Sequence, residues 1–168
     1  LSILEASFVV RMLPPYHRNF NKRLVKSPKL YFLDPGLAAS LLGITAADQL
    51  ATHPLRGALF ETLVFCELIK ARLNSGKRAD LSFWRDNHGR EVDFLCEEGG
   101  RLHAIEAKSG LTVTPSSLKG LLDFARIAGS ISPRLTLVHG GDQTFTSQGA
   151  DVRGWSTVAD AIRDAGES

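Results

Sequence analysis

Apolar and polar residues alternate in two short runs near the middle of the chain, residues 91–96 and 101–108. Successive side chains of a β-strand point to opposite faces, so this alternation predicts two strands. The intervening Glu97-Glu98-Gly99-Gly100 combines polar residues with glycines, as tight loops do. The pattern therefore predicts an antiparallel β-hairpin.

From residue 56 onward the hydrophobic pattern predicts a helix, three strands, a second helix and a fourth strand. Three adjacent strands favour antiparallel pairing, and a crossover helix lets the fourth strand pair in parallel. We therefore expect an α/β sandwich around a mixed sheet. The expected elements are a helix over 56–73, strands over 81–85, 91–96 and 101–108, a helix over 115–128, a strand over 134–139, a polar loop over 140–149, a strand over 152–155 and a helix over 156–162.

In the N-terminal third of the chain, the hydrophobic pattern and the turn residues predict shorter helices and strands. Pro14-Pro15 end the first strand, because proline cannot donate a hydrogen bond to a strand ladder. Asp34 is a good N-cap for a helix that has Pro35 in its first position. The expected elements are the tail of a helix over 1–7, strands over 8–13, 24–25 and 29–33, and short helices over 35–42 and 45–50.

The predicted hairpin gathers charged side chains on one face. Glu91 and Asp93 share a face of the first strand, and Glu106 and Lys108 share a face of the second. With residues 97–100 as the loop, Glu106 would lie opposite Glu91 and diagonal to Asp93. Like charges across a strand pair repel, so we expect a cation there, and Mg²⁺ prefers oxygen ligands. A solvated hairpin face with Lys108 paired locally is the alternative that the spacing leaves open.

Glu61 is the exception in the predicted helix over 56–73. Its position falls on the same helical face as Gly57, Phe65 and Leu68, which is otherwise apolar. An unpaired carboxylate buried in such a stripe is costly. Glu61 therefore either reaches water at the edge of the stripe or meets a cation.

The composition is that of an ordinary globular protein, with 168 residues, 43% hydrophobic and 23% charged. No apolar run reaches the roughly 18 residues of a membrane span, so we expect no membrane contact. The start of the chain is not Met and lacks a signal-peptide pattern, so we expect a piece of a longer protein. Two cysteines without metal-ligand spacing predict reduced core residues and a cytoplasmic protein.

Positive charge is concentrated near the N-terminus. Residues 6–33 hold six Lys or Arg and no Asp or Glu, whereas the rest of the chain holds 14 basic and 18 acidic residues. This asymmetry predicts a surface that meets an anion, with nucleic acid as the main candidate. A solvated basic loop and a surface that docks on an acidic partner remain alternatives. The residues expected to bind nucleic acid are Arg18, Lys22, Arg23 and Lys26.

The order of elements, together with four charged residues, resembles the PD-(D/E)XK nuclease superfamily. The core of that superfamily is a helix, three strands, a helix and a strand, with an acid at the end of the second strand and Glu-x-Lys on the third. Asp93 matches the acid, and Glu106-Ala107-Lys108 match Glu-x-Lys. Glu61 matches an acid that many members carry on the first core helix. The resemblance covers roughly residues 56–140 and implies a restriction-endonuclease-like fold.

Several segments resemble the C-terminal domain, of unknown function, of a prokaryotic AAA-type ATP-binding protein family. The resemblance implies an upstream ATPase module and a winged-helix segment. Residues 1–33 would be the tail of that segment with its basic hairpin, residues 34–55 a helical connector and residues 56–168 the nuclease-like domain. This chain has no Gly-x-x-x-x-Gly-Lys-Ser/Thr loop, so ATP would act only through the upstream module.

The superfamily resemblance implies cleavage of DNA with Mg²⁺, or Mn²⁺, as cofactor. Asp93 and Glu106 would hold the metal, and Lys108 would orient a water or stabilise charge on the phosphate. The alternative is a catalytically inactive module that binds nucleic acid or docks on its ATPase. Expected partners are DNA and the ATPase module, and a homo-oligomer stays open. Further expected ligands are Glu61 and the carbonyl of Ala107, and the accessory residues are Glu91 and His88.

Overall fold

The computed structural model describes residues 1–16, 27–98 and 100–163. Their strands form a two-stranded hairpin and a six-stranded sheet in the order β3-β4-β5-β6-β8-β7. The β3–β4, β4–β5 and β7–β8 pairs are antiparallel, and the β5–β6 and β6–β8 pairs are parallel. The strands are β3 (Ser82–Arg85), β4 (Glu91–Glu98), β5 (Arg101–Lys108), β6 (Arg134–His139), β7 (Phe145–Ser147) and β8 (Ala150–Gly154).

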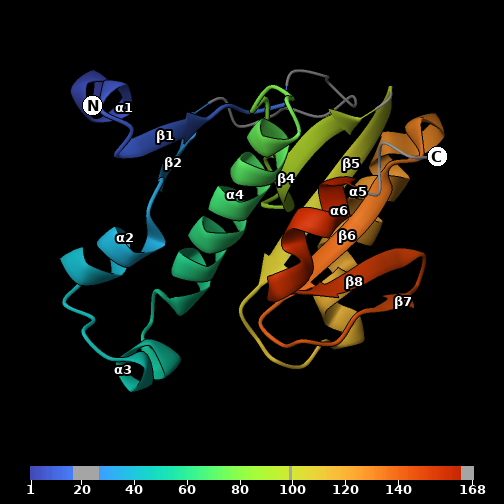
Figure 1. Ribbon diagram of the computed structural model, residues 1–168. Helices are drawn as coiled ribbons and strands as arrows, with labels where there is room; N and C mark the ends of the chain where they lie inside the picture. Colours follow the sequence, from blue (N-terminus) through green and yellow to red (C-terminus); the bar gives the residue numbers. More distant parts are fainter. Residues whose placement is uncertain (17–26, 99, 164–168) are drawn as a thin grey trace.

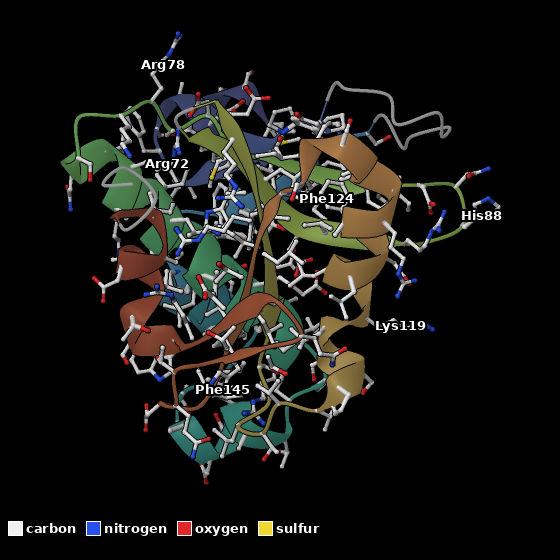
Figure 2. The ribbon with its side chains drawn as sticks, turned by 90° about the vertical axis from the view of Figure 1, so that its right-hand side faces the viewer. Arg72, Arg78, His88, Lys119, Phe124 and Phe145 are labelled. Carbon is white, nitrogen blue, oxygen red and sulfur yellow. The ribbon has the colours of Figure 1, made fainter. Side chains whose placement is uncertain are left out.

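Helices cover both faces of this sheet. Figure 2 shows the sheet edge-on, with α4 (Arg56–Asn74) and α6 (Val158–Arg163) on one side and α5 (Lys119–Ala128) on the other. One apolar core lies under α4 and α6, and a second lies under α5, where Phe124 packs against Trp84 with ring centroids 5.1 Å apart. The predicted order of helix, three antiparallel strands, helix and parallel strand is confirmed, as is an α/β fold with a mixed sheet.

The loop predicted over 140–149 is wrong in its second half, because β7 lies within it. Gln148 and Gly149 have φ angles of 51° and 79°. Positive φ at both central residues of a two-residue turn matches the twist of an antiparallel strand pair. This turn brings Phe145–Ser147 back along β8 as an edge strand.

The register predicted for the central hairpin is also wrong. Glu98 pairs with Arg101 and Phe94 pairs with Ile105, so two residues, and not four, separate the paired ends of the strands. A two-residue loop that contains Gly100 at φ 80° suffices for a hairpin, and the two glutamates before it extend β4. Continued by one residue, this register brings Glu106 opposite Asp93 rather than opposite Glu91.

The N-terminal segment forms its own small hairpin beside the sheet (Figure 1). Strands β1 (Val10–Leu13) and β2 (Lys29–Phe32) pair antiparallel after the short α1 (Ser2–Ala6), as predicted. The hairpin is anchored to α4, because the Tyr31 ring stacks on Phe65 with centroids 4.4 Å apart. The strand predicted over 24–25 lies outside the described residues.

Two short helices, α2 (Pro35–Leu41) and α3 (Ala47–Thr52), connect this hairpin to α4. The predicted N-cap of α2 is confirmed, because Asp34 Oδ1 accepts hydrogen bonds from the backbone N–H groups of Gly36 and Leu37. Cys66 and Cys96 are buried and form no disulfide bond with each other, as expected. No described helix has the length and apolar character needed to cross a membrane.

Candidate active site

Asp93 lies at an irregularity in β4. Relative to β3, β4 carries one extra residue between Val92 and Leu95. A β-bulge of this kind breaks the strict alternation of side chains and redirects them. Asp93 is only 8% exposed, and its Oδ2 accepts a hydrogen bond from the backbone N–H of Ala107 at 3.0 Å. The bulge therefore fixes the Asp93 carboxylate against the edge of β5.

Glu106 and Lys108, two residues apart on β5, form what we call the Lys108 half of the site. Lys108 Nζ donates to Glu106 Oε1 at 2.6 Å. Glu106 Oε2 is buried and has no hydrogen-bond partner among the described residues. A Cβ atom at Gly120 of α5 would lie 3.8 Å from Glu106 Oε1 and 3.9 Å from Oε2. The glycine therefore leaves open the space next to this carboxylate.

These side chains line a pocket of about 380 Å³ between the sheet and α5. Asp93, Glu106 and Lys108 contribute from the sheet, and Lys119 contributes from the start of α5, where Figure 2 labels it. The other residues that line the pocket are Gly89, Arg90, Glu91, Ser116, Ser117, Gly120 and Asp123. Acidic and basic groups thus share one polar pocket.

A second lysine, from the N-terminal hairpin, also contacts Asp93. Lys29 Nζ lies 2.8 Å from Glu61 Oε1 and 3.6 Å from Asp93 Oδ1, and it also forms an ion pair with Glu91. We call Lys29 and these three carboxylates the Lys29 half of the site. Glu61 thus meets a cation, one of the two outcomes that its place on the helix predicted. Asp93 belongs to both halves of the site, because it lines the pocket, as Glu91 also does, and accepts a hydrogen bond from the N–H of Ala107, next to Glu106.

Two further side chains complete the Lys29 half. The hydroxyl of Tyr31 donates a hydrogen bond to Glu61. Arg85 Nε donates to Glu91 Oε2 at 2.6 Å. Glu91 is therefore paired with two cations, Lys29 and Arg85, and its charge is balanced within the protein.

Burial shifts the pKa values of the two buried carboxylates that line the pocket, Asp93 and Glu106. Burial raises the pKa of Asp93 well above its ordinary value, and the charges of Glu106 and Glu61 raise it further. Burial also raises the pKa of Glu106, although Lys108 opposes this shift. Burial acts to lower the pKa of Lys29, but the surrounding carboxylates outweigh it and the pKa is raised. An additional cation near Asp93 and Glu106 would therefore favour their ionised forms.

The residues of the Lys108 half fit a magnesium ion. Among the described residues, no group of three or more His, Cys, Asp or Glu side chains is arranged to hold a metal by itself. Magnesium takes only one or two carboxylates and completes its coordination with water and substrate phosphate. The unpartnered Glu106 oxygen and the space beside Gly120 suit such a partly open site.

The structure brings most of the predicted site residues together. Four of them share the pocket: Glu91, Asp93, Glu106 and Lys108. The ligand roles predicted for Glu61 and for the Ala107 carbonyl stay predictions. In this structure the Glu61 carboxylate contacts Lys29 and Tyr31, and the Ala107 N–H donates to Asp93.

The remaining predicted residues lie elsewhere. His88 is exposed at the turn between β3 and β4 and points away from the sheet in Figure 2. His103, three residues before Glu106 and therefore on the opposite face of β5, is buried and contacts Thr136 at 2.8 Å. The predicted nucleic-acid residues Arg18, Lys22, Arg23 and Lys26 lie outside the described part of the chain.

Sequence reasoning missed the role of Lys29, which it counted only as one of six basic residues. Lys29 and Tyr31 are two residues apart on β2, so their side chains share a face, and both contact Glu61. A lysine and a tyrosine at this spacing were the available signal. The partner carboxylate is 32 residues away from Lys29, so only the packed structure shows the contact.

The fold and the pocket define an α/β domain with a buried carboxylate pair and an adjacent lysine. Residues 56–157 match the model of a domain of unknown function, DUF4143, so the chain belongs to that family. This confirms the predicted resemblance to a domain of unknown function. Residues 1–48 match a second domain of unknown function, DUF8612.

Two curated relatives are similar to this chain. They are uncharacterized protein Rv2008c of Mycobacterium tuberculosis and uncharacterized protein Mb2031c of Mycobacterium bovis. Each is 35% identical over 148 residues, which cover 86% of this chain and 31% of the relative. The chain therefore corresponds to one part of longer proteins.

Proposed function

We propose that this domain is a magnesium-dependent nuclease that cleaves DNA. The observation that carries the proposal is the meeting of Asp93, Glu106 and Lys108 in one polar pocket, where one buried oxygen of Glu106 has no hydrogen-bond partner in the part of the chain that the structure describes. The order α4, β3, β4, β5, α5 and β6 supports it, because it follows the core order of the PD-(D/E)XK superfamily.

Asp93 and Glu106 would hold the metal, and a bound Mg²⁺ supplies Lewis acidity and lowers the pKa of a bound water. The hydrogen bond from Ala107 fixes the Asp93 carboxylate in place. Lys108 is 47% exposed at its side chain while it contacts Glu106, so it can reach a substrate phosphate or orient a water. Lys119 adds positive charge at the pocket, which suits the polyanionic backbone of DNA, whereas the charge of Arg90 is paired with Asp86.

Cleavage assays on the full chain with Asp93→Asn and Lys108→Ala test this proposal. Removal of either group should lower the rate of DNA cleavage in Mg²⁺ by about 100-fold or more, as the loss of a charge-stabilising group does in other enzymes. Glu67→Gln is the matched control, since it removes a carboxylate that pairs with Lys70 on the surface of α4. Undiminished cleavage by both site variants would show that the activity, if present, resides elsewhere.

A non-catalytic role is the second candidate, and a specific observation favours it. Lys29 and Arg85 already balance much of the charge of the acidic residues without a metal. In that case the domain would bind DNA, or dock on an AAA-type ATPase module, within a longer cytoplasmic protein. The relatives are long enough for such a module, because this chain spans 31% of them.

The two candidates separate experimentally. The non-catalytic role predicts no hydrolysis with any divalent metal, and a DNA affinity that falls steeply with salt concentration. Replacement of the four basic residues predicted to contact nucleic acid should then weaken DNA binding. Unchanged DNA binding would count against the DNA-binding form of this role. The replaced residues are Arg18, Lys22, Arg23 and Lys26.

A further inference from the structure

The ammonium group of Lys29 lies among three carboxylates. It contacts Glu61 from α4 and Glu91 and Asp93 from β4, so its ligands come from two elements that are separate in the sequence. All three carboxylates are largely buried, with side-chain exposures of 24%, 21% and 11%. Buried carboxylates this close together need a positive charge among them.

The protein holds Lys29 in this position through its own packing. The side chain is 18% exposed, and Nζ lies 5.5 Å from the centre of the Phe83 ring. Two residues along β2, Tyr31 stacks on Phe65 and donates a hydrogen bond to the same glutamate, Glu61. The strand therefore delivers the lysine and a second donor together, which a mobile surface lysine would not do.

The Lys108 half is separate from this arrangement but shares Asp93 with it. Lys29 has contacts with Glu61, Glu91 and Asp93, whereas Glu106 pairs with Lys108 and keeps one buried oxygen unpartnered. Nucleases with two metals place two cations about 3.5–4 Å apart on either side of a substrate phosphate. Asp93 contacts Lys29 and also lines the pocket beside Glu106, so it would lie between two such cation positions.

We infer that Lys29 is a built-in cation that takes the place of a second divalent ion, so that the site accepts one divalent ion, on the Glu106 side. Glu61 is then a partner of Lys29 and not a metal ligand. The N-terminal hairpin completes the site, although it belongs to the segment matched by a different family model from the rest. One part of the inference, the divalent ion on the Glu106 side, rests on the proposed function. The role of Lys29 rests on its contacts with the three carboxylates.

Titration of the full chain with Mn²⁺ tests this assignment by the number of ions bound. The parent should bind one Mn²⁺ per chain, and Lys29→Met should bind two. Methionine keeps an unbranched side chain over Phe83 but leaves the three carboxylates free to bind a metal. Electron paramagnetic resonance of Lys29→Met should show coupling between the two ions. A variant that gains no ion overturns the inference.

Two matched variants control for charge and for position. Lys29→Arg keeps the positive charge and should bind one ion, like the parent. Lys108→Met removes the lysine of the other half and should also bind one ion. A second ion in Lys108→Met would mean that any loss of positive charge recruits metal, and would overturn the specific role of Lys29.

Glu61→Gln tests the same assignment while Lys29 stays in place. We expect it to bind one Mn²⁺ with the affinity of the parent, whereas loss of that ion would make Glu61 a metal ligand and overturn the inference. Glu106→Gln instead tests the proposed function, which requires that this variant lose the ion. A protein that binds Mn²⁺ only after Lys29 is replaced would support the inference and count against the proposed function.

Discussion

The two halves of the site neutralise their carboxylates in different ways. In the Lys29 half, one lysine from a distant hairpin contacts three carboxylates and is 18% exposed. In the Lys108 half, the lysine comes from the same strand as its glutamate and is 47% exposed. The first half is closed by long-range packing, whereas the second opens into a pocket and keeps an unpartnered carboxylate oxygen.

This difference separates a structural charge from a reactive one. Lys29 is packed against an aromatic ring and three carboxylates. If its ammonium moved away, these largely buried carboxylates would lose the positive charge that compensates them. A half-exposed lysine with one partner can exchange that partner for a phosphate at little cost. We therefore assign stability mainly to Lys29 and chemistry mainly to Lys108.

The largest expected effect is on stability when Lys29 is replaced. Without metal, Lys29→Met should lower the free energy of unfolding by about 3 kcal/mol, the low end for a broken buried ion pair, because the carboxylates retain some exposure. Urea unfolding in EDTA measures this loss. Lys70→Met is the control, since its surface pair with Glu67 should contribute less than about 1 kcal/mol. If both variants lost the same free energy of unfolding, Lys29 would contribute no more to stability than a surface lysine, which would contradict its structural role.

A smaller effect is expected from Glu106→Gln, with a characteristic pH dependence. The raised pKa of Glu106 means that the folded state keeps its proton to higher pH than the unfolded state. This contribution to stability is present at low pH and is lost as pH rises from the ordinary glutamate pKa of 4.5 through the raised pKa of the folded state. In EDTA, Glu106→Gln should therefore be more stable than the parent at pH 7, and the difference should shrink towards pH 4.

Urea unfolding of both proteins at several pH values measures this difference. The same experiment with Mg²⁺ should reverse the order, because only the parent binds the ion in its folded state and gains stability from it. A higher free energy of unfolding for the parent than for the variant at pH 7 in EDTA would contradict this expectation. It would mean that the ion pair with Lys108 stabilises the ionised Glu106 by more than burial destabilises it.

The smallest effect on stability is expected from Lys108→Met. The Lys108 side chain is half-exposed and pairs with one carboxylate. The variant should therefore lose less than about 1 kcal/mol of its free energy of unfolding. DNA cleavage by the same variant should nevertheless fall to background if Lys108 is reactive. Thermal unfolding and a cleavage assay on one preparation separate the two roles. If Lys108→Met were strongly destabilised, Lys108 would be a structural residue, like Lys29.

The sequence predicts one half of this site better than the other for a physical reason. Asp93, Glu106 and Lys108 lie on the two adjacent strands of one hairpin, so the local pattern predicts that they are near one another, although the register and the bulge set their positions. Lys29 enters through the packing of Tyr31 on Phe65, a contact between residues far apart in the sequence. No local pattern contains that contact.

Local geometry also limited the prediction of the fold. Element order follows from hydrophobic periodicity, and α4 to β6 appear where they were expected. The register of β4 and β5 depends on whether the loop has four residues or two, which the polar Glu97 and Glu98 leave open. The bulge at Asp93 depends on the neighbouring strand β3, and so it carries no signal within β4 itself.

The most direct measurement is a calorimetric titration of the full chain with Mg²⁺ and Mn²⁺, next to Glu106→Gln and Glu61→Gln. We predict saturable binding of one ion by the parent and by Glu61→Gln, and loss of that binding in Glu106→Gln. Equal binding by the parent and Glu106→Gln, or no binding by any of the three, would contradict a metal site at the Lys108 half.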